Sequence, residues 1–278
     1  MPVTRLQPER AESIRLMIHA TAMVDPSAKI ADDASIGRHV VVEPYAIIGA
    51  GVAIGANTRI GAHATIHGPT VIGEGNRIFQ HASLGAAPQD IGFQDEDTQL
   101  VIGDRNIIRE YASLNRGTLK GGGITKIGSD NFLMAYVHIG HDCQVGDHNI
   151  FTNSTSLAGH VAVGDYCNFG GFSLLHQFIR IGSYAFTSMG SVINRDVPPF
   201  VIVSGNYARS YGINKVGLQR KGFSKELIQA INTAYKLLVR KRSNTQVALQ
   251  KLNPLAEQFS EVKLLIDFIQ GSERGIVK

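Results

Sequence analysis

The stretch IGAGVAIGANTRIGAHATIHGPTVIG (residues 48–73) places an isoleucine at every sixth position. The same register of apolar residues begins at Ile18, is interrupted twice, and ends weakly at Thr187 and Ile193. This period fits neither a helix nor a long strand. It is typical of a parallel β-helix, in which each hexapeptide forms a short strand and a turn. The register runs through Ile18, Val24, Ile30, Ile36, Val42, Ile48, Ile54, Ile60, Ile66, Ile72, Ile78 and Leu84, then Ile102, Ile108 and Leu114, then Ile127, Leu133, Ile139, Val145, Phe151, Leu157, Val163, Phe169, Leu175 and Ile181.

Chance does not explain this register, because apolar residues make up only 44% of the chain but fill nearly all of these positions. Three hexapeptides complete one coil of the β-helix, so one coil takes 18 residues. Residues 18 apart in this sequence therefore stack on neighbouring coils, about 4.8 Å from each other. Spacing along the sequence thus predicts distance in the fold.

The register divides the chain into three parts. Residues 1–16 are a polar N-terminal extension, residues 17–197 form the coil, and residues 198–278 form a C-terminal helical domain. Two segments inside the coil, residues 86–101 and 116–126, lose the register, which resumes after each of them. We expect both to project as loops, and loops on a rigid scaffold often carry function.

The C-terminal part has the apolar spacing of helices. Ser224 is a candidate N-cap for the first long helix. Shorter helical patterns follow at residues 245–252 and 260–270, where Asn253-Pro254 is expected to interrupt the helix and Gly271 to end it. A helical bundle here would cover the open end of the coil and its strand edges.

The bulk composition limits the classes of function. The net charge of +4 and the pI of about 9.1 suit an acidic partner or a phosphorylated substrate, and we expect no nucleic acid. The sequence has no apolar run of 18 residues and no N-terminal apolar segment, so neither a membrane span nor a signal peptide is expected. Cys143 and Cys167 fall on different faces of the coil and are not expected to pair, which favours a cytoplasmic location.

The segment HIGHDC (residues 138–143) is the richest in chemical groups. The inward register falls between its two histidines, so His138 and His141 are expected near the outer surface. Asp142 could orient the imidazole of His141 and stabilise its charged form. Gly159 lies 18 residues after His141, where its N–H could donate to an oxyanion beside that imidazole.

His160 follows directly, and His176 lies on the next coil, so four histidines line one side of three successive coils. Two other interpretations stay open. Solvated surface histidines are common, and imidazole is the commonest zinc ligand. Neither cysteine converges on these histidines and no carboxylate repeats at the coil spacing, so we expect no metal site.

Several motifs carry a more specific resemblance, which covers essentially all of the chain after residue 17. The motifs are PQD (88–90), GDRNIIRE (103–110), GSDNFLM (128–134), HIGHDC (138–143), LAGH (157–160), HQF (176–178), DVPP (196–199), GN (205–206), GIN (212–214) and RKGF (220–223). Together they resemble the UDP-N-acetylglucosamine acyltransferases of lipid A biosynthesis, a branch of the hexapeptide-repeat acyltransferase family.

This resemblance implies a left-handed parallel β-helix followed by a helical domain, assembled as a homotrimer with active sites in the clefts between subunits. The implied reaction moves a 3-hydroxyacyl chain from acyl carrier protein to the 3-hydroxyl of UDP-N-acetylglucosamine, without metal or cofactor. His141 would be the general base, Asp142 its support, and the Gly159 N–H the oxyanion donor. The implied substrate-binding residues are Gln89, Asp90, His138, His160, His176, Gln177, Asn214, Arg220 and Lys221.

The sequence departs from the family pattern at three positions on the nucleotide-sugar side. Gly92 stands where the family has lysine, Asn115 where it has histidine, and Val216 where it has glutamate. Loss of a cation near a diphosphate should weaken binding. Lys215 and Lys221 are candidates to supply that charge, and a lysine restored at position 92 is expected to strengthen binding of the nucleotide sugar.

Two other functions stay open on these residues alone. One is a paralogous acyltransferase acting on a modified nucleotide sugar, such as a 3-amino analogue. The other is a metal-dependent hydratase or a non-catalytic scaffold on the same solenoid.

Two further expectations concern the acyl donor. Met189 lies where the resemblance puts the far end of the acyl groove, and it predicts a short chain of about ten carbons, because each methylene denied burial forfeits about 0.8 kcal/mol. The alternative is that Met189 packs in the core. The basic cluster Arg240-Lys241-Arg242 is a candidate docking surface for the acidic carrier protein, or else a solvated helix end.

Overall fold

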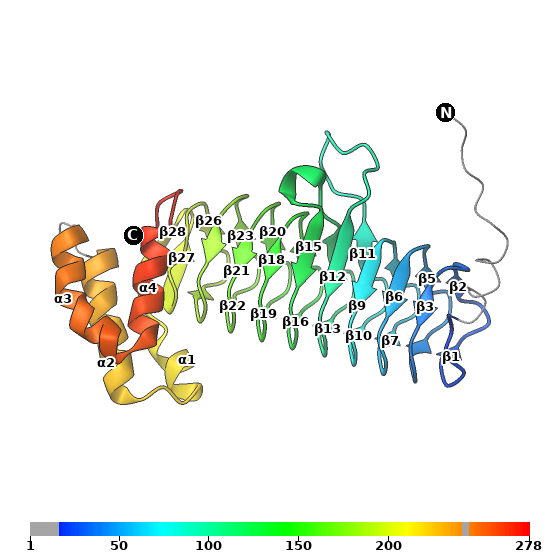
Figure 1. The fold of residues 1–278 in the computed structure, drawn as a ribbon, viewed down its shortest axis with the longest axis horizontal. Coiled ribbons are helices and arrows are strands. Elements are labelled where there is room, and N and C mark those ends of the chain that lie inside the picture. Colours follow the sequence, from blue (N-terminus) through cyan, green and yellow to red (C-terminus); the bar gives the residue numbers. More distant parts are fainter. Residues whose placement is uncertain (1–16, 241–244) are drawn as a thin grey trace.

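The computed structural model describes residues 17–240 and 245–278. The expected N-terminal extension (1–16) and the Lys241 and Arg242 positions of the basic cluster lie outside the described residues. The chain forms a triangular prism of stacked coils with helices at its C-terminal end (Figure 1). The coil is a left-handed parallel β-helix, as expected.

Each coil contributes one strand to each of three sheets, which we call faces I, II and III. Face I contains β1 (Met23–Val24), β4 (Val41–Val42), β7 (Arg59–Ile60), β10 (Arg77–Ile78), β13 (Ile107–Ile108), β16 (Phe132–Leu133), β19 (Ile150–Phe151), β22 (Asn168–Phe169), β25 (Phe186–Thr187), β27 (Val201–Gly205) and β28 (Ala208–Ile213). Face II contains β2 (Lys29–Ile30), β5 (Ile47–Ile48), β8 (Thr65–Ile66), β11 (Ser83–Ala86), β14 (Ser113–Asn115), β17 (His138–Ile139), β20 (Ser156–Leu157), β23 (Leu174–Leu175) and β26 (Val192–Ile193). Face III contains β3 (Ser35–Ile36), β6 (Val52–Ile54), β9 (Thr70–Ile72), β12 (Gln99–Ile102), β15 (Ile124–Ile127), β18 (Gln144–Val145), β21 (Ala162–Val163) and β24 (Arg180–Ile181).

The apolar register forms the core of the prism. From Ile36 to Ile193 the side chains in this register are buried. Ile18, at the open N-terminal end, is 40% exposed, because no coil lies beneath it among the described residues. Parallel pairing joins residues 18 apart, as in Val42 with Ile60.

Glycine after the register position has a packing cause. A Cβ atom at Gly61 would lie 2.5 Å from the backbone nitrogen of Gln80 on the next coil, and one at Gly55 would lie 2.6 Å from the carbonyl carbon of Gly73. The left-handed backbone conformation falls instead two residues later, at the corners, where His63 has φ 58° and Tyr136 has φ 62°. The coil therefore needs glycine for close approach of backbones and not for the turn itself.

A ladder of buried asparagines lines the inside of the corner between faces III and I. The side chain of Asn76 accepts from the N–H and the amide of Asn106, and Asn106 accepts in the same way from Asn131. Asn131 then accepts from the Asn149 N–H, and Asn149 from the Cys167 N–H. These bonds satisfy backbone donors that the turns leave inside the prism.

The two segments without the register project from the same side of the prism (Figure 1). The first loop spans residues 87–98, between β11 and β12, and the second spans residues 116–123, between β14 and β15. The second contains a short 3-10 helix, η2 (Leu119–Gly121). Ile72 still pairs with Ile102, and Ile102 with Ile127, so both loops leave the stacking of face III intact.

The C-terminal part begins with two strands that continue face I before its helices start. β27 pairs in parallel with β25, so the last coil extends beyond residue 197, and β28 returns antiparallel to β27. The helical elements are α1 (Lys215–Arg220), α2 (Lys225–Tyr235), the π-helix η3 (Lys236–Arg240), α3 (Thr245–Gln258) and α4 (Ser260–Gln270). None of the helices that the structure describes is long and apolar enough to cross a membrane.

Ser224 caps α2 as expected, because its side chain accepts from the Leu227 N–H. The expected interruption at Pro254 was wrong: α3 continues through it. Leu252 is fully buried and Leu255 packs against the core, so apolar packing on both sides of the proline outweighs the lost hydrogen bond.

Close approach of the coils makes a testable prediction. Gly61→Ala should lower the free energy of unfolding by about 1–3 kcal/mol, because its Cβ would press on the rigid backbone of the next coil. Gly271→Ala is the control, since a Cβ there meets first the flexible end of Arg180, at 3.3 Å, and the backbone has φ −84°. Urea unfolding midpoints measure both. Equal midpoints for Gly61→Ala and wild type would contradict the packing argument.

Candidate active site

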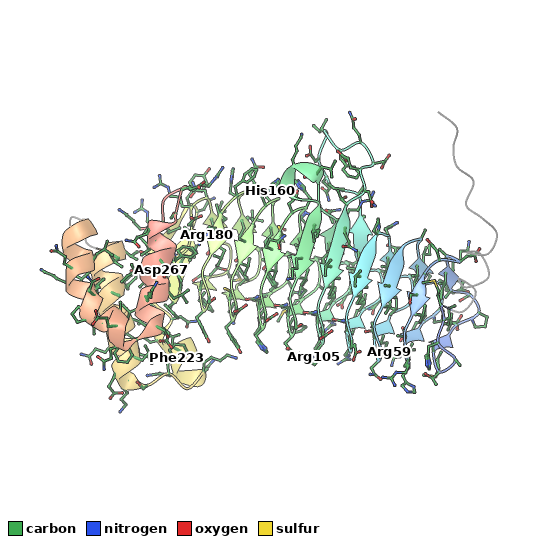
Figure 2. The ribbon with its side chains drawn as sticks, viewed as in Figure 1. Arg59, Arg105, His160, Arg180, Phe223 and Asp267 are labelled. Carbon is green, nitrogen blue, oxygen red and sulfur yellow. The ribbon has the colours of Figure 1, made fainter. Side chains whose placement is uncertain are left out.

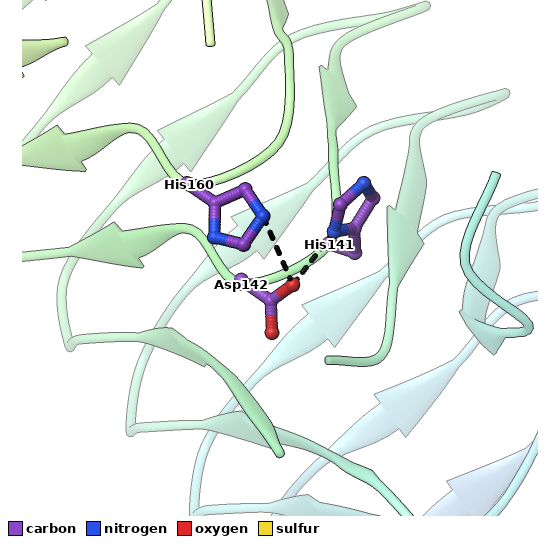
Figure 3. A group of neighbouring side chains, drawn as sticks. All are labelled: His141, Asp142 and His160. Atoms are coloured by element: carbon purple, nitrogen blue, oxygen red, sulfur yellow. Dashed lines mark hydrogen bonds and ion pairs between the residues drawn. The ribbon is translucent and has the colours of Figure 1, made fainter. Parts of the chain in front are cut away.

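The two loops project beside the corner that joins faces II and III, and this corner carries the HIGHDC segment. After β17 the chain passes Gly140 and turns at Asp142, which has φ 61°. His141 and Asp142 therefore lie at the corner itself, and His160 occupies the equivalent corner of the next coil. Figure 3 shows His141, Asp142 and His160 converging there.

Asp142 is the centre of this group, and its carboxylate is held from several sides. His141 Nδ1 lies 2.7 Å from Asp142 Oδ2, and His160 Nε2 lies 3.6 Å from the same oxygen (Figure 3). Thr118 in the second loop donates its N–H to Oδ1 and its hydroxyl to Oδ2, both at 2.7 Å. The Asp142 side chain is only 1% exposed, so these bonds replace the water that an ionised carboxylate needs.

Local backbone contacts explain why this geometry is fixed. The Asp142 N–H donates to Thr125 Oγ1 at 2.7 Å. Any side chain at Gly121 would collide with the Asp142 carboxylate, so glycine lets the second loop close over it. The fixed carboxylate accepts a hydrogen bond from the Nδ1–H of His141. The proton therefore stays on Nδ1, and Nε2 is left as the free, basic nitrogen.

Gly159 lies directly over the imidazole of His141, as the coil spacing predicted. A Cβ atom at Gly159 would lie 2.7 Å from His141 Nε2. The Gly159 N–H has no hydrogen-bond partner among the residues that the structure describes. A free donor thus lies beside the free nitrogen of the base, the arrangement that an oxyanion next to a base requires.

Two further histidines flank the pair. His138 Nδ1 lies 2.8 Å from Ser113 Oγ, and burial lowers the pKa of this imidazole, with a further contribution from the charge of His141. Burial also lowers the pKa of His160, and Asp142 partly opposes that shift. Both rings are therefore neutral near pH 7 and can donate or accept hydrogen bonds to a ligand.

The first loop adds a carboxylate to the site. The Gly92 N–H donates to Asp90 Oδ1 at 2.8 Å and holds the pKa of Asp90 below its ordinary value. The charges of Lys120, His141 and His160 lower this pKa further. Asp90 is therefore ionised and faces the histidines, whereas the neighbouring Gln89 is exposed.

Side chains on the next coil continue this side of the prism toward the C-terminus. His160 stacks on Phe178, with 4.3 Å between ring centroids. His176 and Gln177 are exposed beside Phe178, and His176 Nδ1 lies 3.2 Å from a guanidinium nitrogen of Arg274. His176 thus belongs to the same side of the prism but does not touch His141.

The structure does not bring the remaining predicted residues to this corner. Asn214 and Arg220 line a cavity of about 280 Å³ on face I, with Asn168, Phe186 and Ile202. Face I is opposite the corner between faces II and III in a triangular prism. Figure 2 shows this separation: His160 lies beside the loops, and Phe223, just after α1, lies at the other edge.

Lys221 and Met189 also lie around face I. Lys221 Nζ sits 4.4 Å from the ring centre of Tyr166, at the corner between faces III and I. Met189 precedes the corner residue Gly190 between faces I and II and is 78% exposed, so the alternative that it packs in the core was wrong.

The departures at positions 115 and 216 have different surroundings. Asn115 is buried and donates its amide to the carbonyl oxygens of Ala86 and Ala87, so it ties the second loop to the base of the first. Val216 is 58% exposed at the edge of the face I cavity. Asn115 therefore has a structural role in this chain.

Sequence reasoning missed Thr118, Thr125 and Lys120, all from the second loop or the strand after it. No periodic pattern marks these residues, because the loop breaks the register. The available signal was the glycine run of residues 121–123 on the coil just before the histidines, which predicts a tight, close-fitting loop.

The acidic and imidazole groups are close enough to hold a metal ion. The ligand atoms of His141, Asp142 and His160 lie within 4.8 Å of one another. Asp142 Oδ2, however, already accepts from the Thr118 hydroxyl and from His141 Nδ1. This donor set favours acid–base chemistry. Cys143 is no nucleophile here, because burial raises the pKa of its thiol to about 12.

Comparisons with known families and proteins agree over most of the chain. A family model described as "Udp N-acetylglucosamine O-acyltransferase; Domain 2" matches residues 196–277, and one for the bacterial transferase hexapeptide (six repeats) matches residues 33–68 and 124–157. The acyl-[acyl-carrier-protein]–UDP-N-acetylglucosamine O-acyltransferase of Thiobacillus denitrificans is 51% identical over 94% of this chain and 99% of that protein. Its counterpart in Stenotrophomonas maltophilia (strain R551-3) is 49% identical over 94% and 97%.

Solved structures show the same similarity. The crystal structure of UDP-N-acetylglucosamine O-acyltransferase from Moraxella catarrhalis matches with a TM-score of 0.83 and 44% identity. The match covers 95% of this chain and 100% of that one. Coil and helical domain are thus both similar to those of these proteins.

Burial of His138 makes the free energy of unfolding depend on pH. The pKa of the ring is lowered from 6.5 in the folded chain, so unfolding lets it take up a proton once the pH falls below that value. Its stabilising contribution is complete above about pH 6.5 and is lost as the pH falls toward the folded pKa. Between pH 7 and pH 5 the wild type should therefore lose more unfolding free energy in urea than His138→Gln. Equal losses would show that the ring titrates normally.

Proposed function

This chain belongs to the acyl-[acyl-carrier-protein]–UDP-N-acetylglucosamine O-acyltransferases, and we propose that its catalytic centre is the corner between faces II and III, with His141 as general base. The enzyme transfers a 3-hydroxyacyl chain from acyl carrier protein to the 3-hydroxyl of UDP-N-acetylglucosamine, the first step of lipid A biosynthesis. The observation that carries the catalytic proposal is the buried Asp142 carboxylate bonded to His141 Nδ1.

The reaction begins with removal of a proton from the acceptor. His141 Nε2 takes the proton of the sugar 3-hydroxyl as that oxygen attacks the thioester carbonyl carbon. Asp142 fixes the tautomer that leaves Nε2 free, and it stabilises the imidazolium that forms. Thr118 holds the Asp142 carboxylate in place with two hydrogen bonds.

The second half of the reaction uses the neighbouring coil. The thioester oxygen becomes an oxyanion, and the free N–H of Gly159 is positioned to donate to it. Collapse of this intermediate breaks the carbon–sulfur bond and forms the ester. The imidazolium returns its proton to the leaving thiolate of the carrier. No step needs a metal or a redox cofactor.

The remaining binding residues divide between two subunits in this proposal. Gln89, Asp90, His138 and His160 bind substrate from the same chain as His141, and His176 and Gln177 extend that surface. Asn214, Arg220, Lys221 and Met189 lie around the opposite face I, so they can reach the corner only from a neighbouring copy. A homotrimer of prisms, each presenting face I to the next subunit's corner, brings both sets together.

Two further proposals concern the carrier and the compartment. Arg240, at the end of η3, starts the basic cluster that we propose as the docking surface for acidic acyl carrier protein. A cytoplasmic location is supported by the two buried, unpaired cysteines.

Removal of the base tests the catalytic proposal. His141→Ala should lower kcat by about 10²–10⁴-fold, measured with a 3-hydroxyacyl carrier and UDP-N-acetylglucosamine. The thermal midpoint should stay near wild type, and both proteins should sediment as trimers, because the His141 side chain lies at the corner, is 15% exposed and takes no part in the apolar core. A variant that keeps more than half the wild-type rate would remove His141 from this role.

Met189 provides a separate test of the acyl groove. The wild type should prefer chains of about ten carbons, and Met189→Gly should shift the preference toward fourteen, because each extra methylene that becomes buried contributes about 0.8 kcal/mol. Competition between ten- and fourteen-carbon hydroxyacyl carriers measures the ratio of kcat/KM. Leu174→Ala, another exposed apolar side chain on face II, is the control and should leave the ratio unchanged. An unshifted ratio in Met189→Gly would show that Met189 does not limit chain length.

A further inference from the structure

The two loops meet where the family's lysine is missing. A Cβ atom added to Gly92 would lie 3.1 Å from Lys120 Nζ and 3.4 Å from Asp90 Oδ1. The ammonium of Lys120, from η2 in the second loop, therefore occupies the space into which a side chain at position 92 would grow. Asp90 and Lys120 converge on one point, although 30 residues separate them in the sequence.

A cation at this point would offset the repulsion between the Asp90 carboxylate and a bound diphosphate. Asp90 is ionised and lies in the first loop beside the corner that carries His141 and His160, whose charges act on it. In the proposed function this is where the acceptor sugar presents its hydroxyl. The diphosphate of a nucleotide sugar lies one sugar ring from that hydroxyl. An uncompensated carboxylate there would repel it, and a lysine ammonium beside the carboxylate offsets the repulsion.

We propose that Lys120 is the residue that supplies the positive charge for the diphosphate of the nucleotide-sugar acceptor, in place of a lysine at position 92. This inference rests on the proposed function and deepens it, because it assigns a binding residue from the second loop. It also accounts for the Gly92 departure without a change of acceptor.

The second loop holds Lys120 in place through the catalytic carboxylate. Thr118, two residues earlier, binds Asp142 with both its N–H and its hydroxyl, and the same hydroxyl oxygen accepts from the Gly121 N–H at 3.2 Å. Lys120 therefore lies between two residues fixed against Asp142. Its own side chain is exposed and free to meet a ligand.

The other basic residues are placed for different contacts. Arg116 donates to the carbonyl oxygen of Gly68 at 3.0 Å, and its guanidinium lies 5.3 Å from the centre of the Phe93 ring. Lys215 and Lys221, expected from the sequence to compensate for Gly92, are the first residue of α1 and its C-cap, on the face I side. Among the described residues, Lys120 is the permanently charged cation that lowers the pKa of Asp90.

The test compares acceptor binding in variants of the full-length enzyme. Lys120→Gln should raise the KM for UDP-N-acetylglucosamine about tenfold to a hundredfold, since a hydrogen bond to a charged group is lost. Its kcat and its KM for the acyl carrier should stay near wild type. The double variant Lys120→Gln/Gly92→Lys should recover most of the affinity. Lys29→Gln, an exposed lysine on β2 far from the loops, is the control for net charge and should change nothing.

The outcomes separate this inference from the proposed function. A wild-type enzyme that does not acylate UDP-N-acetylglucosamine would end the proposed function. An active wild type with an unchanged KM in Lys120→Gln would leave that function standing and overturn the role of Lys120. The sequence alone led us to expect stronger binding for Gly92→Lys, but the position of Lys120 Nζ changes this expectation. Gly92→Lys alone should gain nothing, because Lys120 already fills that space, so a tenfold gain there would also overturn the role of Lys120. Calorimetric titration with the nucleotide sugar, without the carrier, provides a readout independent of turnover.

Discussion

The backbone of each coil rests directly on the backbone of the coil before it, and this contact determines what each position can hold. Glycine stands where the next coil comes closest, as at Gly61, and stacked rings occupy corners such as His63 and His81, whose ring centroids are 5.1 Å apart. The same alignment puts Gly159 over the imidazole of His141. The catalytic geometry is therefore a local case of the rule that builds the whole prism.

Burial of one carboxylate links the scaffold to the chemistry. Asp142 lies at a corner that the coil alone would leave open, and the second loop closes over it through Thr118. The loop thus shields the carboxylate from water, and in the proposed mechanism it orients the base and holds Lys120 beside the acceptor. Asn115, the last residue of β14 just before the same loop, donates to the carbonyl oxygens of Ala86 and Ala87 and so connects the bases of the two loops.

Much of this structure follows from the sequence, and the rest does not for identifiable reasons. A six-residue register predicts the coil, and the 18-residue spacing of His141 and Gly159 predicts their contact, because stacking turns spacing into distance. Thr118 and Lys120 lie in a loop without the six-residue register, so the 18-residue stacking rule does not apply to them. Their positions beside Asp142 and Asp90 could therefore not be predicted from the sequence. α3 continues through Pro254, so apolar packing outweighs the tendency of proline to interrupt a helix. The separation of Asn214 from His141 becomes visible only when the faces are known.

The loops enter and leave the coil without disturbing its phase, since Ile72, Ile102 and Ile127 remain stacked in one column. The stacking that holds Gly159 above His141 therefore does not depend on either loop. The second loop is still constrained by its contacts with Asp142, whereas the first loop can change in length and composition without disturbing those contacts. In a solenoid of this kind, residues that recognise a ligand can be placed in a loop while the stacked coils keep their geometry.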